Sequence, residues 1–239
     1  MENSYLIIGA GCDIGVEFIK LLLNRKTNFI IATYRSEDSK KRLLDLIKDT
    51  EVNFDIVHLD FEVLSSLQNV LNDISYIKYV VDLAHNNLEE LFASLKDKHI
   101  VDYYTANIIN RAIFLKYIVR KMLTKRKGRL LYLSSTAVMY PNKGQSLYSS
   151  SKSAVENIYK SIGIEMGNRG ITSVILRFGY INSGRALSFV QDKNDLLQDF
   201  LIEPSEVAKK VDFFLHDDGK CFNANEVVID RGFFSSKRF

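Results

Sequence analysis

The chain has 239 residues, 46% of them hydrophobic and 26% charged, which is enough to bury a substantial core and ordinary for a globular protein. Its net charge of +3 is too small to favour a nucleic-acid-binding protein, and the basic run 125–127 is better explained as the solvated end of a helix. The cysteines lie far apart and the histidines lack ligand spacing, so we expect neither a disulfide framework nor a metal site.

The N-terminus leads straight into a short apolar run without the basic segment of a signal peptide. No apolar stretch approaches the length that spans a membrane. We therefore expect a cytoplasmic protein with no membrane contact.

Short apolar runs alternate with segments of helical period along the whole chain. Several of the runs are apolar on both faces, as strands between two helix layers are. The alternation predicts an α/β fold, with a doubly wound parallel sheet in a single domain, 1–239. The expected strands are 4–8, 29–33, 54–58, 79–84, 129–134, 172–178 and 226–230, and the expected helices are 14–25, 37–49, 63–73, 104–126, 147–168 and 204–216.

A glycine-rich loop follows the first expected strand and opens the first helix. Glycines at such a junction let a pyrophosphate approach the helix N-terminus, whose free N–H groups attract anions. The alternative is that glycine only marks a tight turn, but the position favours dinucleotide binding. Asp13 adds a negative charge where the pyrophosphate should approach. Its alternative roles are a hydrogen bond to a ribose hydroxyl and a helix cap. The loop residues that we assign to a cofactor are Gly9, Gly11, Cys12, Asp13, Ile14 and Gly15.

The end of the second expected strand bears on the choice of cofactor. An acidic residue there suits the ribose of NAD, whereas arginine suits the 2′-phosphate of NADP. The chain has Tyr34, Arg35 and Ser36 at this point and no carboxylate before Glu37. The sequence therefore favours NADP(H), with NAD(H) possible.

Two tyrosines are each followed by a lysine four positions later, so the spacing alone is uninformative. Tyr117 and Lys121 lie inside the helical segment 104–126, far from any strand end. Ile109 and Ile113 share a helix face with Tyr117, which predicts that Tyr117 packs in the core. We consider this pair unrelated to catalysis.

Tyr148 and Lys152 have different surroundings. Ser135 precedes them in the chain, just past the expected strand 129–134, at the edge of the sheet where ligands bind. The spacing places the phenol and the ammonium on one helix face. Because an ammonium favours phenolate, it lowers the pKa of the tyrosine and makes it a better general acid or base.

These residues resemble those of the short-chain dehydrogenases/reductases, and the likeness covers nearly the whole chain. That family carries Ser, Tyr-x-x-x-Lys and an upstream Asn on a Rossmann-like, three-layer fold with about seven strands. Ser135, Tyr148 and Lys152 match in identity and spacing, and Asn107 stands where the family's Asn lies. Further positions resemble the family's cofactor contacts: Asp60, Phe61, Ala84, Gly179, Ile181 and Ser183.

The resemblance implies an NAD(P)(H)-dependent oxidoreductase that interconverts a carbonyl and a secondary alcohol by hydride transfer. It implies that Tyr148 exchanges a proton with the substrate oxygen and that Ser135 holds this oxygen. Lys152 would lower the tyrosine pKa and hold the nicotinamide ribose, and Asn107 would anchor a proton-relaying water. A small-molecule substrate and a homodimer or homotetramer are also implied, with 180–203 as a flap over the substrate.

Several positions depart from the family's pattern. Asp13 replaces a glycine, and Asp82 and His85 replace the first Asn and the Gly of an Asn-Asn-Ala-Gly motif. Phe178 replaces a proline, and Arg231 replaces a glycine. The alternative that these changes raise is a catalytically silent binding or scaffold subunit.

Overall fold

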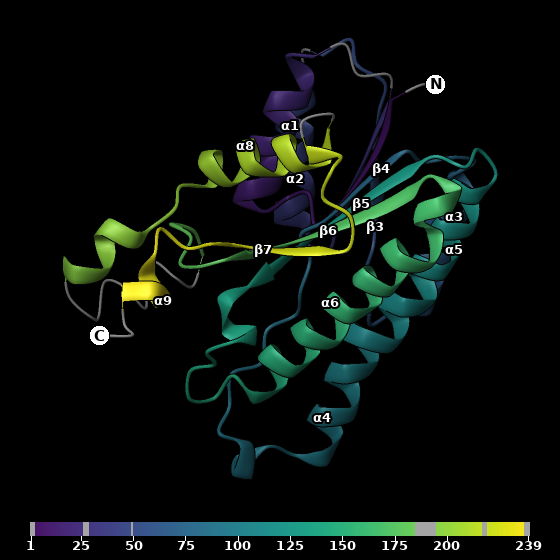
Figure 1. Cartoon of the computed structure of the whole chain (residues 1–239). Coiled ribbons are helices and arrows are strands. Elements are labelled where there is room, and N and C mark those ends of the chain that lie inside the picture. Colours follow the sequence, from purple (N-terminus) through teal and green to yellow (C-terminus); the bar gives the residue numbers. More distant parts are fainter. Residues whose placement is uncertain (1–2, 26–28, 49, 185–194, 217–218, 237–239) are drawn as a thin grey trace.

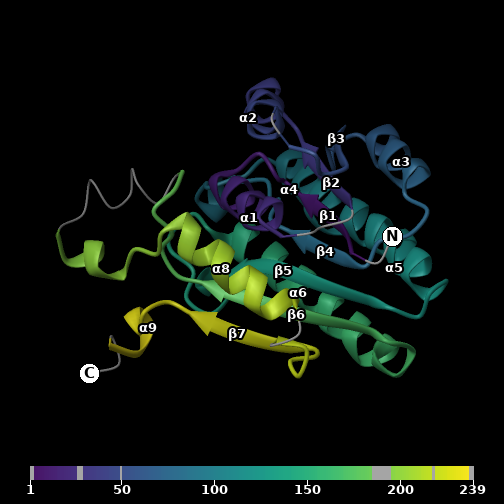
Figure 2. The same cartoon turned by 90° about the horizontal axis from the view of Figure 1, so that it is seen from above.

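The computed structural model describes residues 3–25, 29–48, 50–184, 195–216 and 219–236. All of its named strands are parallel members of one seven-stranded sheet, in the order β3-β2-β1-β4-β5-β6-β7 (Figure 2). The strand order reverses beside β1, which creates a crevice at the carboxyl ends of β1 and β4. The strands are β1 (Ser4–Ile8), β2 (Phe29–Tyr34), β3 (Phe54–His58), β4 (Tyr79–Asp82), β5 (Gly128–Ser135), β6 (Ile171–Phe178) and β7 (Asn225–Ile229).

Helices cover both faces of the sheet, which confirms the predicted three-layer fold (Figure 1). One layer consists of α1 (Asp13–Leu23), α2 (Glu37–Ile47) and α8 (Pro204–Leu215). The other consists of α3 (Leu64–Asp73), α5 (Arg111–Leu123) and α6 (Ser146–Met166). In the described part of the chain, no helix is long and apolar enough to cross a membrane. The remaining helices are η1 (Phe92–Ser94), α4 (Asp97–Tyr104), the π-helix η2 (Thr105–Asn110), η3 (Thr136–Val138), η4 (Gly167–Arg169), η5 (Asp195–Phe200) and α9 (Phe233–Ser236).

The inner strands are buried on both faces, as their apolar sequences predict, whereas the edge strands β3 and β7 are partly exposed. In β1, Tyr5 and Ile7 pack in the core beneath α1 and α8, while Leu6 and Ile8 pack beneath α3, α5 and α6. Side chains alternate between the two faces of a strand, so an apolar run without alternation is what a central strand requires. Burying each such side chain fully is worth about 1.5–3 kcal/mol.

The predicted elements all occur, with shifted boundaries. The helix expected at 104–126 begins earlier, at Asp97, and consists of α4, the π-helix η2 and α5 in succession (Figure 1). Tyr103 is the buried residue of α4, so this helix leaves no apolar stripe from which its start could be predicted. The strand expected at 79–84 is shorter in the structure, because β4 ends at Asp82.

The prediction that Tyr117 packs in the core is wrong. Tyr117 is 40% exposed, and Ile109 and Ile113 are 53% and 38% exposed. The buried face of α5 is instead the one that carries Phe114 and Ile118. The apolar residues on both sides of this helix made the sequence ambiguous about which side faces the sheet.

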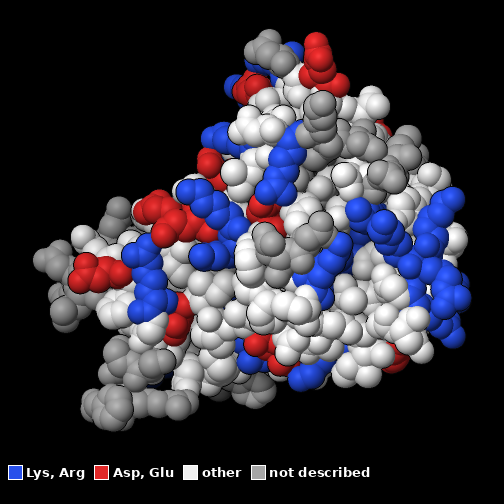
Figure 3. Space-filling model, turned by 45° about the horizontal axis from the view of Figure 1, so that its top comes forward, with Lys and Arg blue, Asp and Glu red and all other residues white. Residues whose placement is uncertain are grey.

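The basic run 125–127 follows the end of α5 at Leu123, in agreement with its interpretation as a helix terminus. Figure 3 shows one face of the molecule. On its right side, toward the turn where α5 leads into β5, Lys and Arg side chains gather. Acidic side chains lie elsewhere on the same face, interspersed with basic ones, as on an ordinary solvated surface.

The segment 180–203, expected as a flap, is described in part, since residues 185–194 lie outside the described residues. Its ends are joined by a bridge between Ile181 and Ile202. The rings of Tyr180 and Phe200 both contact Phe233 of α9, with ring centroids 5.3 and 5.1 Å apart. The segment is thereby fastened beside the C-terminal helix. Its role as a substrate flap stays a prediction.

Candidate active site

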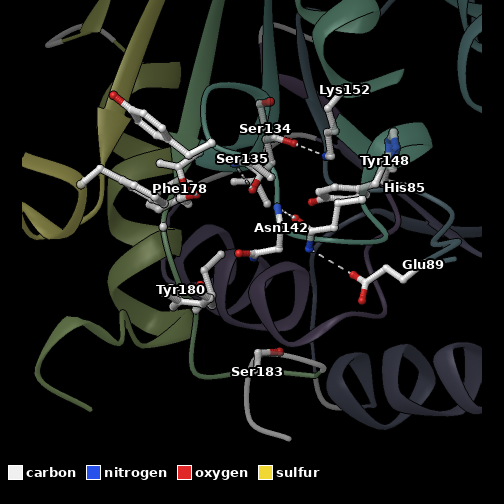
Figure 4. Close-up of a pocket in the computed structure, with 18 of the residues that line it drawn as sticks. His85, Glu89, Ser134, Ser135, Asn142, Tyr148, Lys152, Phe178, Tyr180 and Ser183 are labelled. Atoms are coloured by element: carbon white, nitrogen blue, oxygen red, sulfur yellow. Dashed lines mark hydrogen bonds between the residues drawn. The ribbon is translucent and has the colours of Figure 1, made fainter. Parts of the chain in front are cut away.

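Three of the predicted catalytic side chains line one cavity at the carboxyl end of β5, here called the catalytic cavity (Figure 4). Ser135 is the last residue of β5, Tyr148 lies in the first turn of α6, and Lys152 follows one turn later. The cavity has a volume of about 360 Å³. Gly179, Ile181 and Ser183, which were predicted from the cofactor pattern, line it as well.

Lys152 is buried but remains close to Tyr148. Its side chain is 4% exposed, and Nζ donates a hydrogen bond of 2.7 Å to the carbonyl oxygen of Leu133. Nζ also lies 4.7 Å from the ring centroid of Tyr132 and 5.9 Å from that of Tyr148. An ammonium at this position favours the phenolate form of the tyrosine.

Ser135 is held by the backbone that follows β5. Its Oγ accepts a hydrogen bond of 3.1 Å from the amide of Ala137, which caps the short helix η3. Because Oγ serves as an acceptor there, its own proton is a donor for an oxygen atom in the cavity.

Asn107 lies behind the catalytic cavity, in the π-helix η2, with 1% of its surface exposed. Its Oδ1 accepts a 2.9 Å hydrogen bond from the amide of Asn86, and its Nδ2 donates one of 3.0 Å to the carbonyl of Tyr103. The main-chain carbonyl of Asn107 accepts a further hydrogen bond, of 3.2 Å, from Arg111. Asn107 therefore holds the loop after β4, and π-helices often mark functional sites in this way.

A second cavity, of about 350 Å³, lies between the glycine loop and the ends of β2 and β3; we call it the nucleotide cavity. Leu83 and His85 line both cavities, so the two are adjoining parts of one cleft along the carboxyl edge of the sheet. Such a two-part cleft has the form that a dinucleotide requires. The predicted cofactor residues that line the nucleotide cavity are Gly9, Gly11, Cys12, Tyr34, Arg35, Asp60, Phe61 and Ala84.

The glycine loop fits a pyrophosphate at the N-terminus of α1. Gly9 has a positive φ of 76°, and a Cβ atom there would lie 3.0 Å from the amide nitrogen of Ala84. A Cβ at Gly15 would lie 2.3 Å from the carbonyl oxygen of Ala10. Both positions therefore require glycine, and the loop stays close enough to α1 for its N–H groups to face an anion.

Asp13 is the first residue of α1, and two side chains bind its carboxylate. Ser183 donates to Oδ2 at 2.5 Å, and Arg42 of α2 donates to Oδ1 at 2.6 Å. These two hydrogen bonds, that of Ser183 first, lower the pKa of Asp13 below its ordinary value. Asp13 does not cap the helix: the cap is Cys12, whose Sγ accepts a hydrogen bond from the amide of Gly15 at 3.4 Å.

Two other predicted cofactor residues have local roles. Ser36 caps α2, since its Oγ accepts a 3.3 Å hydrogen bond from the amide of Ser39. Ile14 is 8% exposed and packs in the core. Arg35, which lines the nucleotide cavity, donates a 2.5 Å hydrogen bond to Oδ1 of Asn86.

Several residues around the cleft carry no signal in the sequence that assigns them to it. Arg42 lines the nucleotide cavity, and no local pattern distinguishes it from the other cations of α2. Phe234 lines the catalytic cavity and stacks on Tyr140 with ring centroids 4.7 Å apart, although it is nearly at the end of the chain. Arg111 is 1% exposed and forms an ion pair with the equally buried Asp82. The helix α5 also carries Lys116, Arg120 and Lys121, so no local signal set Arg111 apart.

Comparisons with known proteins agree with this geometry. The family model for short chain dehydrogenase matches residues 3–194. A 3-oxoacyl-[acyl-carrier-protein] reductase of Buchnera aphidicola is 29% identical over 76% of this chain and 75% of its own. The corresponding reductase of Salmonella typhimurium is 27% identical over 96% of both chains.

Solved structures share the fold. A short chain dehydrogenase/reductase family protein superposes with a TM-score of 0.87 at 17% identity, covering 98% of both chains. ElxO with bound NADP superposes with a TM-score of 0.84 at 21% identity, covering 98% of this chain and 100% of its own. None of these comparisons supports a catalytically silent subunit. The chain belongs to the short-chain dehydrogenase family and is an oxidoreductase that depends on a nicotinamide dinucleotide.

Proposed function

We propose that this protein is an NADP(H)-dependent reductase of ketones, with Tyr148 as its general acid. The observation that carries the proposal is the arrangement of Ser135, Tyr148 and Lys152 around the catalytic cavity, which adjoins the nucleotide cavity. The reaction needs a proton donor, an oxygen-binding donor and a cation near the phenol, and these three residue types supply them.

The proposed roles are those that the resemblance to the family implies, and the contacts of each side chain are compatible with them. Tyr148 gives its proton to the carbonyl oxygen of the substrate, and the Ser135 hydroxyl donates a hydrogen bond to the same oxygen. Lys152 stabilises the phenolate that remains and binds the ribose next to the nicotinamide. Asn107 orders the loop after β4 and, as the resemblance implies, anchors a water that relays protons. The bound nicotinamide supplies the hydride to the carbonyl carbon.

The preference for the 2′-phosphorylated cofactor rests on two arginines. Arg35 and Arg42 both line the nucleotide cavity, and the end of β2 offers no carboxylate to hold a free ribose hydroxyl. A guanidinium binds phosphate oxygens through paired hydrogen bonds. Both arginines have other partners, Asn86 and Asp13, which they would share with the phosphate.

For the substrate we propose a 3-oxoacyl thioester. Two of the compared relatives carry the name 3-oxoacyl-[acyl-carrier-protein] reductase. The catalytic cavity also has an aromatic side that includes Tyr140, Tyr180 and Phe234, which suits an apolar acyl chain.

We further propose that the protein forms a homodimer or homotetramer in the cytoplasm. Ile109, Ile113 and Tyr117 expose an apolar stripe on η2 and α5, and Ile164 is 67% exposed on the neighbouring α6 (Figure 1). Exposed apolar side chains on neighbouring helices are typical of a contact between subunits.

The test is turnover of a 3-oxoacyl thioester, measured by the loss of NADPH absorbance, together with titration of NADPH and NADH by fluorescence. The wild type should consume NADPH, bind it more tightly than NADH, and lose at least about 100-fold in kcat on Tyr148→Phe with NADPH binding retained. Tyr117→Phe, in the other Tyr–Lys pair, should leave kcat unchanged. Binding of neither cofactor, or full activity of Tyr148→Phe, would disprove the proposal.

A further inference from the structure

Two of the departures from the family's pattern, the buried Asp82 and the half-buried His85, belong to one polar cluster beside Tyr148 and Lys152. We call it the β4 cluster, because its residues surround the carboxyl end of β4. Asp82 ends this strand, and His85 follows shortly after it. The members of the β4 cluster are Asp82, His85, Arg111, Tyr132, Ser151 and Tyr159.

The inner end of the β4 cluster is a buried ion pair. Arg111 donates a short hydrogen bond to Oδ2 of Asp82, and Tyr159 donates to the same oxygen at 2.9 Å. Arg111 also donates to the carbonyl of Ala84 at 2.9 Å, so it is bonded to the segment that leads to His85. Charges this deeply buried persist only when they are paired and hydrogen-bonded. The inner end therefore fixes the backbone at the end of β4.

Tyr132 connects this ion pair to the catalytic lysine. Its ring stacks on that of Tyr159, with centroids 5.0 Å apart and an angle of 19°. The Lys152 ammonium lies over the Tyr132 ring at 4.7 Å. Burial raises the pKa of Tyr132 well above its ordinary value, so it remains a neutral phenol whose ring face attracts a cation.

His85 connects the cluster to the catalytic tyrosine. Its Nε2 lies 3.0 Å from Oγ of Ser151, and its Nδ1 lies 3.5 Å from the Tyr132 hydroxyl. The imidazole ring meets the Tyr148 ring edge-on, with centroids 5.3 Å apart and an angle of 89°, and Figure 4 shows the two side by side. Ser151 lies on α6 between Tyr148 and Lys152, so His85 is bonded to the helix that carries both.

We propose that Tyr132 and His85 are positioning residues for the reaction: Tyr132 fixes the ammonium of Lys152, and His85 fixes the ring of Tyr148. The proposal rests on the proposed role of Tyr148 as general acid. It assigns a purpose to one departure that otherwise looks like a loss, since His85 replaces a glycine of the family's pattern by a side chain that contacts Tyr148 and Ser151.

The distance between the ammonium and the phenol sets how strongly Lys152 lowers the pKa of Tyr148. A change in Tyr132 or His85 must therefore appear in the titration of Tyr148, whereas a general loss of packing need not. The titratable and charged groups around the pair come from several elements: Asp82, His85 and Glu89 at and after the end of β4, Tyr103 on α4, Arg111 on α5, Tyr132 on β5, Tyr140 and Lys143 between β5 and α6, Glu156 and Tyr159 on α6, and Tyr180 after β6.

The experiment compares matched variants of the full chain. Tyr132→Leu removes the aromatic ring beneath Lys152, and Tyr132→Phe keeps the ring but removes its hydroxyl. The control Tyr79→Leu removes an equally buried ring at the opposite end of β4, where Tyr79 stacks on Tyr5 at 4.9 Å. His85→Ala removes the contact with Tyr148, and His85→Phe restores an aromatic ring.

Two measurements are made on each variant. The first is the pH profile of kcat. The second is the titration of the Tyr148 phenol by NMR, with ¹³C-labelled tyrosine assigned by its loss in Tyr148→Phe. The second measurement needs no substrate, so it tests the positioning even if the proposed substrate is wrong. Lys152→Met marks the largest shift that loss of the ammonium can cause.

We expect Tyr132→Leu to raise the Tyr148 midpoint toward that of Lys152→Met and to lower kcat about fivefold, with Tyr132→Phe within about twofold of the wild type. His85→Ala should raise the Tyr148 midpoint and lower kcat to a similar extent, and His85→Phe should recover most of both. Wild-type midpoints in Tyr132→Leu and His85→Ala would overturn the proposal. An equal shift in Tyr79→Leu would do so too, because it would show that any loss of core packing suffices. An inactive wild type with the expected NMR shifts would instead contradict only the proposed function.

Discussion

The carboxylate of Asp13 and the guanidinium of Arg42 form an ion pair across the glycine loop, with Oδ1 and Nη2 2.6 Å apart. Arg42 also donates to the carbonyl of Gly11 at 3.0 Å. A negative charge at the N-terminus of α1, where a pyrophosphate is expected, is therefore balanced by a cation from α2. Asp13 thus need not exclude the cofactor, although it competes with it for Arg42.

Asp13→Asn is expected to tighten NADPH binding. The amide keeps the size of the side chain and removes a negative charge near the phosphates, which leaves Arg42 to bind them. For a partly exposed pair the gain is about threefold in Kd. Fluorescence titration of NADPH measures it, with Asp45→Asn on the exposed side of α2 as the control. Weaker binding in Asp13→Asn would show that the carboxylate itself helps to hold the cofactor.

The same substitution should destabilise the cofactor-free protein by an amount that depends on pH, because it removes the carboxylate whose ionised form Ser183 and Arg42 stabilise. Ser183 and Arg42 hold the pKa of Asp13 below its ordinary value of 3.8, so its folded-state pKa is depressed. The stabilisation is therefore present above that ordinary value and is lost as the pH falls through the lower, folded-state pKa. Asp13→Asn should melt below the wild type at pH about 7, and the difference should shrink at pH about 3. Thermal unfolding at both pH values checks this, and an equal difference at both would contradict it.

Arg111→Leu should destabilise the fold strongly. It leaves the carboxylate of Asp82 buried without its cation, which costs about 3–5 kcal/mol. The double variant Asp82→Asn/Arg111→Leu should lose less than Arg111→Leu alone, because no uncompensated charge remains. Urea unfolding measures both, and Arg120→Leu, on the exposed side of the same helix, should stay within about 0.5 kcal/mol of the wild type. Additive losses in the double variant would argue against the pairing.

Gly9→Ala and Gly232→Ala separate two reasons for glycine: a positive φ, which strains other residues, and a close approach of neighbouring backbone. Both residues have a positive φ, of 76° and 79°, so alanine at either costs about 1–2 kcal/mol of backbone strain. A Cβ at Gly9 would also meet the backbone of Ala84 at 3.0 Å, whereas nothing lies within 4 Å of one at Gly232. We expect both variants to lose stability and Gly9→Ala alone to lose NADPH affinity. Normal NADPH binding by Gly9→Ala would remove the loop from the proposed site.

Ile113→Glu should dissociate the proposed oligomer. Ile113 lies in the exposed apolar stripe of α5, and a carboxylate there would have to be desolvated in a subunit contact. Light scattering at micromolar concentration should give a multiple of the monomer mass for the wild type and the monomer mass for the variant. Leu44→Glu, at an exposed apolar position of α2, serves as the control. A monomeric wild type would refute the assembly.

Much of the fold and part of the site could be predicted because they depend on local order in the chain. The two-faced apolar run of β1 indicated a central strand, and it is one. The spacing of Tyr148 and Lys152 placed them one helical turn apart, and the end of β5 placed Ser135 at the same edge of the sheet. Periodicity and strand direction fix such relationships without reference to distant residues.

The partners of the charged residues were decided by the tertiary structure alone. Asp82 of β4 pairs with Arg111 of α5, and Asp13 of α1 pairs with Arg42 of α2. Each ion pair joins two elements that become neighbours only when the sheet and its helices are assembled. The same holds for His85 and Ser151, which lie 66 residues apart. Which face of α5 is buried, and hence that Tyr117 is exposed, also depended on how the helix packs. The sequence determined what each segment can form, and long-range packing determined which side chains lie within the few ångströms over which charges and hydrogen bonds act.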